Sequence, residues 1–268
     1  MGISRRQSLA GLAVGAALAA PARAADDNDD DDDHIPKARI KLIVLDIGGT
    51  LIQDHGEVPE AMLGAFSRHG LAVTPAEFSE WRGASKRGMV GHFVALRGPK
   101  GDQTDLIEAI YADFVSHVTK AYENVQPIAG AEDTLKQLRA SGYILATSTG
   151  FDRALTEMVF RRLNWHGYFV ASITSDDVVD GRPSPFMLFR AMEAAHVDDV
   201  ANVMAVGDTP LDLQAGENAG IAAVIGVSSG AATEDRLRRE RSTGVLPSVA
   251  SLPALLKAGL PLTQWRCR

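Results

Sequence analysis

The chain carries a series of short apolar runs separated by stretches with helical spacing. Residues 42–45 read Leu-Ile-Val-Leu, and further runs typical of buried strands fall at 143–148, 169–173, 202–206 and 222–227. Between these runs, apolar side chains recur three and four residues apart over 130–141, 153–163, 184–195 and 210–219, which predicts helices. Strands that alternate with helices in this way predict an α/β fold with a doubly wound parallel sheet.

A different pattern fills residues 54–125. Apolar residues at three- and four-residue spacing predict helices over 59–69, 75–86, 88–96 and 104–122, with Pro or Thr near the starts and Gly between them. We therefore predict an all-helical insert, called here the cap, at 54–125. The α/β core then consists of residues 37–53 and 126–258, with the first strand and the later strands in one sheet.

The N-terminus has the pattern of an export signal. Residues 4–9 read Ser-Arg-Arg-Gln-Ser-Leu, a twin-arginine pattern, and a moderately apolar stretch leads to the small-residue site Ala-Arg-Ala at 22–24. We predict a signal peptide over 1–24, cleavage after Ala24 and a periplasmic location. The apolar stretch falls short of the roughly 20 residues that span a bilayer, so no stable membrane insertion is expected after cleavage. Residues 25–36 form an acidic spacer whose repelling carboxylates favour disorder.

Composition and charge narrow the classes of function. A chain of 268 residues that is 46% hydrophobic can bury one sizeable core, with room for a smaller inserted domain. The net charge of −7 gives no basic field to attract phosphate backbones, so nucleic acid is not an expected partner. The only cysteine, Cys267, excludes an intramolecular disulfide and a multi-thiolate metal site. Whether the protein forms a homodimer is left open.

Polar residues follow the ends of the predicted strands, where open α/β sheets bind their ligands. They are Asp46, with Gly48 and Gly49 close behind it, Thr149 with Gly150, Arg182, and the pair Asp208 and Asp212. Each has a structural alternative: Asp46 as a turn cap, Thr149 as a helix N-cap, Arg182 as a surface charge, and the later aspartates as a helix start. Their occurrence together, in this order, favours one active site.

These ordered motifs resemble those of the haloacid dehalogenase superfamily of aspartate-nucleophile hydrolases, over residues from about 40 to 257. The resemblance implies a Rossmann-like core with a helical cap, and Asp46 as the nucleophile. It implies Mg²⁺ as cofactor, with Asp46, the backbone carbonyl of Gly48, Asp208 and Asp212 as ligands. It also implies a phosphoryl site formed by Gly48, Thr149, Gly150 and Arg182.

A finer resemblance is to the phosphonatase-like branch of that superfamily. Typical superfamily phosphatases have a second aspartate where this chain has Gly48, and a lysine where it has Arg182. Phosphonatases also carry a cap lysine in a Met-Gly-x-x-Lys stretch that forms a Schiff base, and residues 82–86 read Arg-Gly-Ala-Ser-Lys. Lys86, which alone would be interpreted as part of a solvated charge cluster, thereby becomes a candidate catalytic residue. Two positions depart from the branch: Met89 replaces a histidine and Phe151 a tyrosine.

The chemistry at Gly48 separates two enzymatic hypotheses. Hydrolysis of a phosphate ester needs a general acid for the leaving oxygen, and glycine has none to offer. A carbon leaving group needs an electron sink instead, and a protonated imine on Lys86 is one. Burial at cap closure, with Arg82 and Arg87 nearby, would lower the pKa of Lys86 so that its amine can attack.

Three hypotheses for function follow. The first is a Mg²⁺-dependent hydrolase that cleaves the C–P bond of a small 2-oxo-phosphonate through an aspartyl-phosphate and a Lys86 Schiff base. The second is a phosphomonoesterase that acts on a small phosphate ester and resembles phosphoglycolate phosphatase. The third is a module that binds a phospho-ligand or a metal without turnover. The expected partner is a small molecule in every case.

Overall fold

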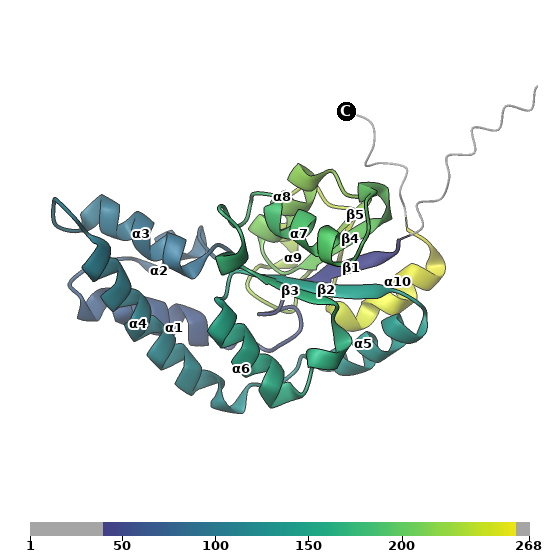
Figure 1. Ribbon diagram of the computed structural model, residues 1–268, viewed down its shortest axis with the longest axis horizontal. Coiled ribbons are helices and arrows are strands. Elements are labelled where there is room, and N and C mark those ends of the chain that lie inside the picture. The colour runs from purple at the N-terminus through teal and green to yellow at the C-terminus, as the bar shows by residue number, and fades with distance from the viewer. Residues whose placement is uncertain (1–39, 261–268) are drawn as a thin grey trace, which may run out of the picture. The chain divides into compact units, whose positions relative to one another are not determined.

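The computed structural model describes residues 40–260, and the predicted signal peptide and acidic spacer lie outside this range. The sheet has six parallel strands in the order β3-β2-β1-β4-β5-β6, with β1 at its centre (Figure 1). The predicted α/β fold class is confirmed. The strands are β1 Leu42–Leu45, β2 Ile144–Thr149, β3 Ala171–Thr174, β4 Val203–Gly207, β5 Ala223–Val227 and β6 Gly244–Leu246.

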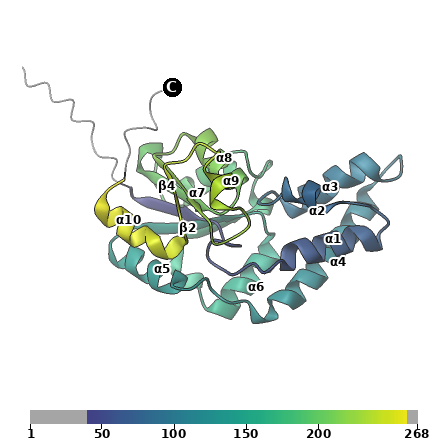
Figure 2. The ribbon, with the colours of Figure 1, turned by 180° about the vertical axis from the view of Figure 1, so that it is seen from behind.

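Helices cover both faces of the sheet, which explains why β1 is apolar at every position. Alternate side chains of a strand point to opposite faces. Ile43 and Leu45 therefore pack with one set of helices, while Leu42 and Val44 pack with the other. The first set is α5 Ala131–Ala140, α6 Arg153–Leu163 and α10 Leu252–Ala258; the second is α7 Phe186–Ala194, α8 Pro210–Ala219 and α9 Glu234–Leu237 (Figures 1 and 2).

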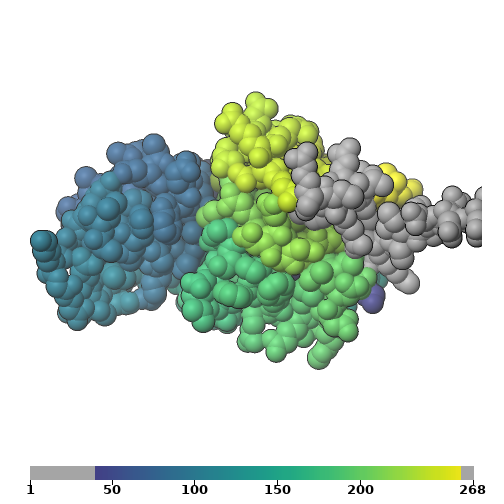
Figure 3. Space-filling model, turned by 90° about the horizontal axis from the view of Figure 1, so that it is seen from above, coloured from purple at the N-terminus to yellow at the C-terminus, as the bar shows by residue number. Residues whose placement is uncertain are grey.

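The cap is helical, as the sequence predicts, and lies between β1 and β2 in the chain. Its helices are α1 Glu57–Arg68, α2 Pro75–Ser79, α3 Lys86–Arg97 and α4 Thr104–Ala121. The longest of them, α4, packs along α1 and against α3, and the rings of Phe66 and Phe93 meet edge to face at 5.4 Å. Figure 3 shows the surface of these helices in blue beside the green and yellow residues of the core. No helix within residues 40–260 is both long and apolar enough to cross a membrane.

The single helix predicted over 75–86 is wrong. The structure ends α2 at Ser79 and begins a new helix, α3, at Lys86. Between them Gly83 adopts φ +89°, which a helix cannot contain, and the Ser85 hydroxyl accepts a hydrogen bond from the Gly88 N–H at 3.2 Å as an N-cap. Residues 80–85 therefore form a turn, and this turn places Lys86 beside the core.

Two adjacent chain segments join the cap to the core. The backbone N–H of Gln53 donates to the carbonyl of Gln126 at 2.9 Å, and the N–H of Ile128 donates to the carbonyl of Leu51 at 2.9 Å. The Gln53 side chain adds a hydrogen bond to the Pro127 carbonyl. The chain therefore leaves the core and re-enters it at the same place, beside the end of β1.

Candidate active site

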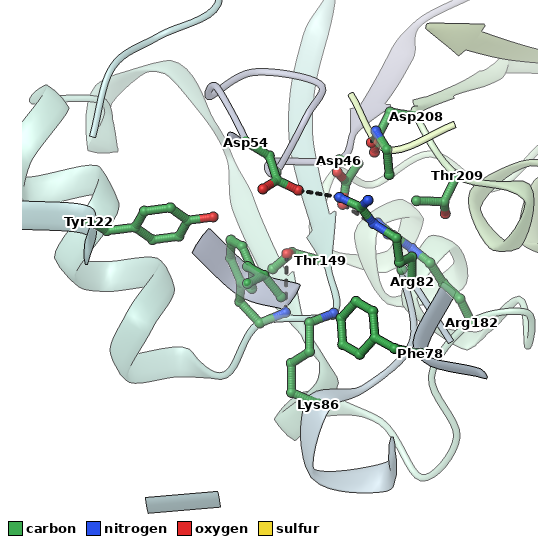
Figure 4. A pocket seen from close by; sticks show the side chains of 16 residues that line it. Asp46, Asp54, Phe78, Arg82, Lys86, Tyr122, Thr149, Arg182, Asp208 and Thr209 are labelled. Carbon is green, nitrogen blue, oxygen red and sulfur yellow. Dashed lines mark hydrogen bonds and ion pairs between the residues drawn. The ribbon is translucent and has the colours of Figure 1, made fainter. Parts of the chain in front are cut away.

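One pocket brings together most of the residues singled out from the sequence. It lies where β1, β2 and β4 end and where the cap turn of residues 80–85 meets the core (Figure 4). Its lining includes Asp46, Gly48, Lys86, Thr149, Gly150, Arg182 and Asp208. Asp212 does not line the pocket, but its carboxylate contacts Arg182.

Asp46 is held rigidly at the end of β1. Its N–H donates to the Val206 carbonyl at 2.9 Å, and its carboxylate pairs with Arg182 at 2.8 Å. Burial raises the pKa of Asp46 to about 6; Arg182 opposes this rise and Asp212 adds to it. Below neutral pH a growing fraction of this carboxyl is protonated, whereas an attacking carboxylate must be ionised.

Arg182 connects two carboxylates in the interior. Its guanidinium pairs with Asp46 and with Asp212, and it also donates to the Ser148 hydroxyl at 3.0 Å. Asp212 is itself oriented from its other oxygen, which accepts from the N–H and the hydroxyl of Thr209 at the start of α8. The interpretation of Arg182 as a surface charge is wrong, because the residue is buried, with 6% of its surface exposed.

Three carboxylates gather at this point. Oxygens of Asp46, Asp208 and Asp212 all lie within 4.8 Å of one another. Burial, with the charges of Asp46 and Asp212, raises the pKa of Asp208 well above its usual range. Asp208 Oδ2 accepts from the Ala231 N–H at 2.5 Å, whereas its Oδ1 is buried without a hydrogen-bond partner among the described residues. Since Mg²⁺ prefers oxygen ligands, this unpaired oxygen and its neighbours fit that ion.

Lys86 is buried, with 5% of its surface exposed, so its interpretation as a solvated charge is wrong. Its amine donates to the Ala84 carbonyl at 3.0 Å and lies 5.9 Å from the Phe151 ring centre. The pKa of Lys86 is lowered to about 8, chiefly by burial; Arg182 and Arg82 contribute to the lowering, while Asp46 and Asp212 act in the opposite direction.

Arg87 does not take part in the way that the sequence suggests. It pairs with Glu108 and stacks over Tyr111 at 4.2 Å, away from the lining of the pocket. The positive neighbours of Lys86 are Arg182 and Arg82 instead. Position 182 is far away in sequence, so its effect on Lys86 could not be read from the local charge pattern.

Small residues allow the cap turn to approach the core closely. A Cβ atom at Gly150 would lie 2.4 Å from the Ala84 carbonyl oxygen, and one at Gly83 would lie 2.3 Å from the Thr209 hydroxyl. At Gly48 the nearest obstacle is Phe151, whose Cζ would be 3.2 Å from an added Cβ. A side chain larger than hydrogen at these positions would separate the cap turn from the core or displace the Phe151 ring.

Thr149 has a different local role from the N-cap that was one alternative for it. Its hydroxyl accepts from the Phe151 N–H at 3.2 Å, while Asp152 caps α6 by accepting from the Leu155 N–H at 2.7 Å. Thr149 therefore shapes the turn after β2, and Gly150 lies in that turn beside the pocket.

Sequence reasoning missed several residues that line the pocket, among them Asp54, Phe78 and Tyr122. Asp54 accepts from the Arg82 guanidinium at 2.6 Å, and the Tyr122 hydroxyl is buried without a hydrogen-bond partner among the described residues. Phe78 and Tyr122 occupy apolar positions of helical segments, where the pattern predicts only packing. The one available signal was the acidic character of Asp54 in the loop after β1; no comparable signal marked Phe78 or Tyr122.

Comparison with known proteins identifies the family of this chain. A family model described as haloacid dehalogenase-like hydrolase matches residues 40–220. The chain belongs to this family of hydrolases. Phosphonoacetaldehyde hydrolase of Salmonella gallinarum is 31% identical over 200 residues, which cover 68% of this chain and 73% of that protein. The phosphonoacetaldehyde hydrolases of Salmonella agona and Salmonella typhi are also 31% identical over the same length.

Solved structures share the fold. A phosphonoacetaldehyde hydrolase-like protein from Oleispira antarctica superposes with a TM-score of 0.70 at 23% identity, covering 82% of this chain and 92% of that one. A putative beta-phosphoglucomutase from Bacteroides vulgatus gives 0.72 at 20% identity, covering 87% and 93%. A predicted phosphoglycolate phosphatase from Haemophilus somnus gives 0.67 at 18% identity, covering 80% and 97%.

Proposed function

We propose that the protein is a Mg²⁺-dependent phosphonatase that cleaves the C–P bond of a small 2-oxo-phosphonate. In this proposal Asp46 is the nucleophile and Lys86 forms a Schiff base with the substrate carbonyl. The observation that carries it is a buried lysine amine in the same pocket as Asp46, with no acidic side chain at Gly48. The relatives named phosphonoacetaldehyde hydrolase support the same choice.

The reaction would begin at Lys86. A neutral amine attacks the carbonyl carbon, and loss of water leaves a protonated imine. A lysine with a pKa near 10.4 is neutral in fewer than one molecule in a thousand at pH 7, whereas a pKa of about 8 leaves about one in ten neutral. Burial of Lys86 therefore increases the reactive fraction by about two orders of magnitude.

Phosphoryl transfer would follow at Asp46. A carboxylate oxygen forms a bond to phosphorus as the C–P bond breaks, and the electron pair of that bond moves into the imine to give an enamine. Protonation and hydrolysis of the enamine release the carbonyl product and free Lys86. Water then hydrolyses the aspartyl-phosphate, which releases inorganic phosphate and restores Asp46.

Positive charge is required because the nucleophile and the substrate are both anionic. Mg²⁺ held by Asp46, Asp208 and Asp212 would supply charge at the phosphonate oxygens. Arg182 would add a fixed guanidinium beside the attacking carboxylate, where preorganised charge favours the transition state. Thr149 would donate a hydrogen bond to a phosphonate oxygen on the β2 side of the pocket, and Gly150, which has no side chain, would let the substrate approach the backbone closely.

Trapping of the imine tests the proposal. Borohydride added together with phosphonoacetaldehyde should inactivate the enzyme irreversibly and leave a reduced adduct on Lys86, found by peptide mass. Lys86→Arg should give no adduct and no C–P cleavage, because a guanidinium stays charged and forms no imine. Lys100→Arg, at an exposed lysine of the same cap, is the matched control and should react like the wild type. Full activity of Lys86→Arg would refute the proposed role.

A phosphomonoesterase is the second candidate, and one observation favours it. Phosphonatases have a histidine at the position of Met89, which here is fully buried and lies outside the lining of the pocket. The aldehyde-handling groups of the branch are thus incomplete, while Asp46 and Asp208 suit either reaction. Turnover of small phosphate monoesters at ordinary enzyme rates, with no release of phosphate from phosphonoacetaldehyde, would decide for this candidate.

A further inference from the structure

A second arginine lies in the pocket, on the cap side. The guanidinium of Arg82 donates to Asp54 Oδ2 at 2.6 Å, and the other oxygen of Asp54 accepts from the Gly56 N–H at 2.9 Å. Asp54, in the loop after β1, therefore holds the Arg82 head group in place (Figure 4). With 25% of its side chain exposed, Arg82 keeps access to a ligand.

The guanidinium of Arg82 has N–H groups left to bind a ligand, whereas the guanidinium of Arg182 is engaged by several protein groups. Arg182 contacts Asp46, Asp212 and Ser148. Among the described residues, Asp54 is the one hydrogen-bond partner of the Arg82 guanidinium, which has five N–H donors.

Tyr122 provides another unused donor in the same region. The residue is 1% exposed, and its hydroxyl has no hydrogen-bond partner among the described residues. Figure 4 shows this hydroxyl pointing into the pocket toward Asp54. Its ring packs against Phe151 at 6.0 Å, which fixes its direction. Burial raises the pKa of Tyr122 well above its usual range, so the hydroxyl keeps its proton. A buried hydroxyl without a hydrogen-bond partner destabilises the protein, and a ligand that accepts from it would remove this cost.

We propose that Arg82 and Tyr122 bind a carboxylate on the organic part of the substrate. The site would then take a phosphonate, or a phosphate in the second candidate function, whose carbon chain ends in a carboxylate. This inference rests on the proposed function in that it places the phosphoryl group at Asp46. An alkyl group would leave the Tyr122 hydroxyl and the free N–H groups of Arg82 unpaired, because neither it nor the rings of Phe78 and Phe151, which also line the pocket, offers an oxygen acceptor.

The presence of Asp54 does not prevent binding of a carboxylate. One guanidinium can bridge two carboxylates, and Arg182 does so in this pocket between Asp46 and Asp212. Asp54 would hold Arg82 on one side while the ligand binds its free N–H groups on the other.

Binding of unreactive ligands tests this inference apart from turnover. Propylphosphonate and 3-phosphonopropanoate have the same chain length and differ in the terminal carboxylate, and neither has a carbonyl that could form an imine. Calorimetry with Mg²⁺ should show the wild type binding 3-phosphonopropanoate about 10- to 100-fold more tightly. Arg82→Met should abolish this preference, and Tyr122→Phe should reduce it about tenfold. Arg87→Met removes a neighbouring arginine outside the pocket and should keep the preference unchanged.

Inorganic phosphate is titrated as a third ligand, and every variant should bind it like the wild type. Equal affinity of the wild type for the two phosphonates would overturn the inference, as would a full preference in Arg82→Met. If Arg82→Met does not fold, Tyr122→Phe decides, because it removes a single oxygen atom; an unchanged preference there also overturns the inference. Failure of C–P cleavage with the preference intact would refute the proposed function alone.

Discussion

Replacement of Gly48 by aspartate tests whether the Phe151 ring leaves too little room for a general acid at position 48. The substitution introduces the acid that an ester-cleaving enzyme needs two positions after its nucleophile. In this structure the new Cβ would lie 3.2 Å from Phe151 Cζ and 3.7 Å from Cε2, before the carboxylate itself is placed. The ring is buried and packs against Tyr122, so it has little room to move.

The expected cost follows from this contact. Overpacking of a close-packed interior costs about 1–3 kcal/mol in the free energy of unfolding. The new carboxyl would also join Asp46 and Asp208, whose pKa values burial already raises. We therefore expect Gly48→Asp alone to lose about 1–3 kcal/mol and to gain less than about tenfold in phosphomonoesterase kcat/KM.

A double-mutant cycle with Phe151→Leu separates the steric effect from the chemical one. Phe151→Leu should cost less than the ~3–5 kcal/mol of truncation to alanine. In the double variant the shorter side chain makes room for the aspartate, so the two losses should not add, with a coupling of about 0.5–3 kcal/mol. Its kcat/KM for small phosphate monoesters should rise by up to about 10²-fold over the wild type.

Urea unfolding and steady-state hydrolysis of a monoester panel measure these quantities. The reasoning fails if Gly48→Asp alone is as stable as the wild type and already shows the full gain in monoester hydrolysis. It also fails if Phe151→Leu changes neither the stability nor the activity of the aspartate variant.

Asp46→Asn should abolish turnover while melting remains cooperative, and rapid acid quench of the wild type during a single turnover should trap a phosphoryl group on Asp46, found by peptide mass; turnover with no phosphorylated Asp46 at any time point would show direct attack by water. Imine trapping at Lys86 should increase with pH and be half-maximal near pH 8, because burial lowers its pKa to about 8 and the neutral amine, present above that value, is the attacking form. A half-maximum above pH 10 would contradict the burial seen here. We also propose export through the twin-arginine route, so replacing Arg5 and Arg6 by lysine should keep the precursor in the cytoplasm; normal periplasmic recovery would refute this.

The strand and helix order of the core could be predicted because its elements are long and strongly periodic. Leu42–Leu45 is buried on both faces, and such a strand reads as one apolar run. Short elements without a clear apolar pattern were not predicted. The strand β6 has three half-buried residues, Gly244–Leu246, and α9 is a single helical turn. Within the cap, the apolar spacing continued across Gly83, so periodicity alone joined two helices that the glycine and the Ser85 cap separate.

Motifs located the core side of the site and Lys86 on its cap side, but not the places of Tyr122 and of the ion pair between Arg82 and Asp54. Asp46, Arg182 and Asp208 follow parallel strands, whose ends must meet at one edge of the sheet. Tyr122 belongs to a segment whose orientation depends on how the cap packs, and no local pattern records that the hydroxyl points into the pocket. The link between Arg82 and Asp54 likewise depends on closure of the cap turn over the loop after β1.

The paired segments that join the cap to the core make the cap an exchangeable module. Because Gln53 is hydrogen-bonded to Gln126 across the junction, a foreign helical insert could be spliced between these two residues without lengthening the path of the core strands. Chimeras built at this junction would keep Asp46, Arg182 and Asp208 while replacing Arg82, Lys86 and Tyr122 together. If the proposed function holds, the residues that contact the organic part of the substrate all lie in this one segment, so its exchange as a unit would change them together.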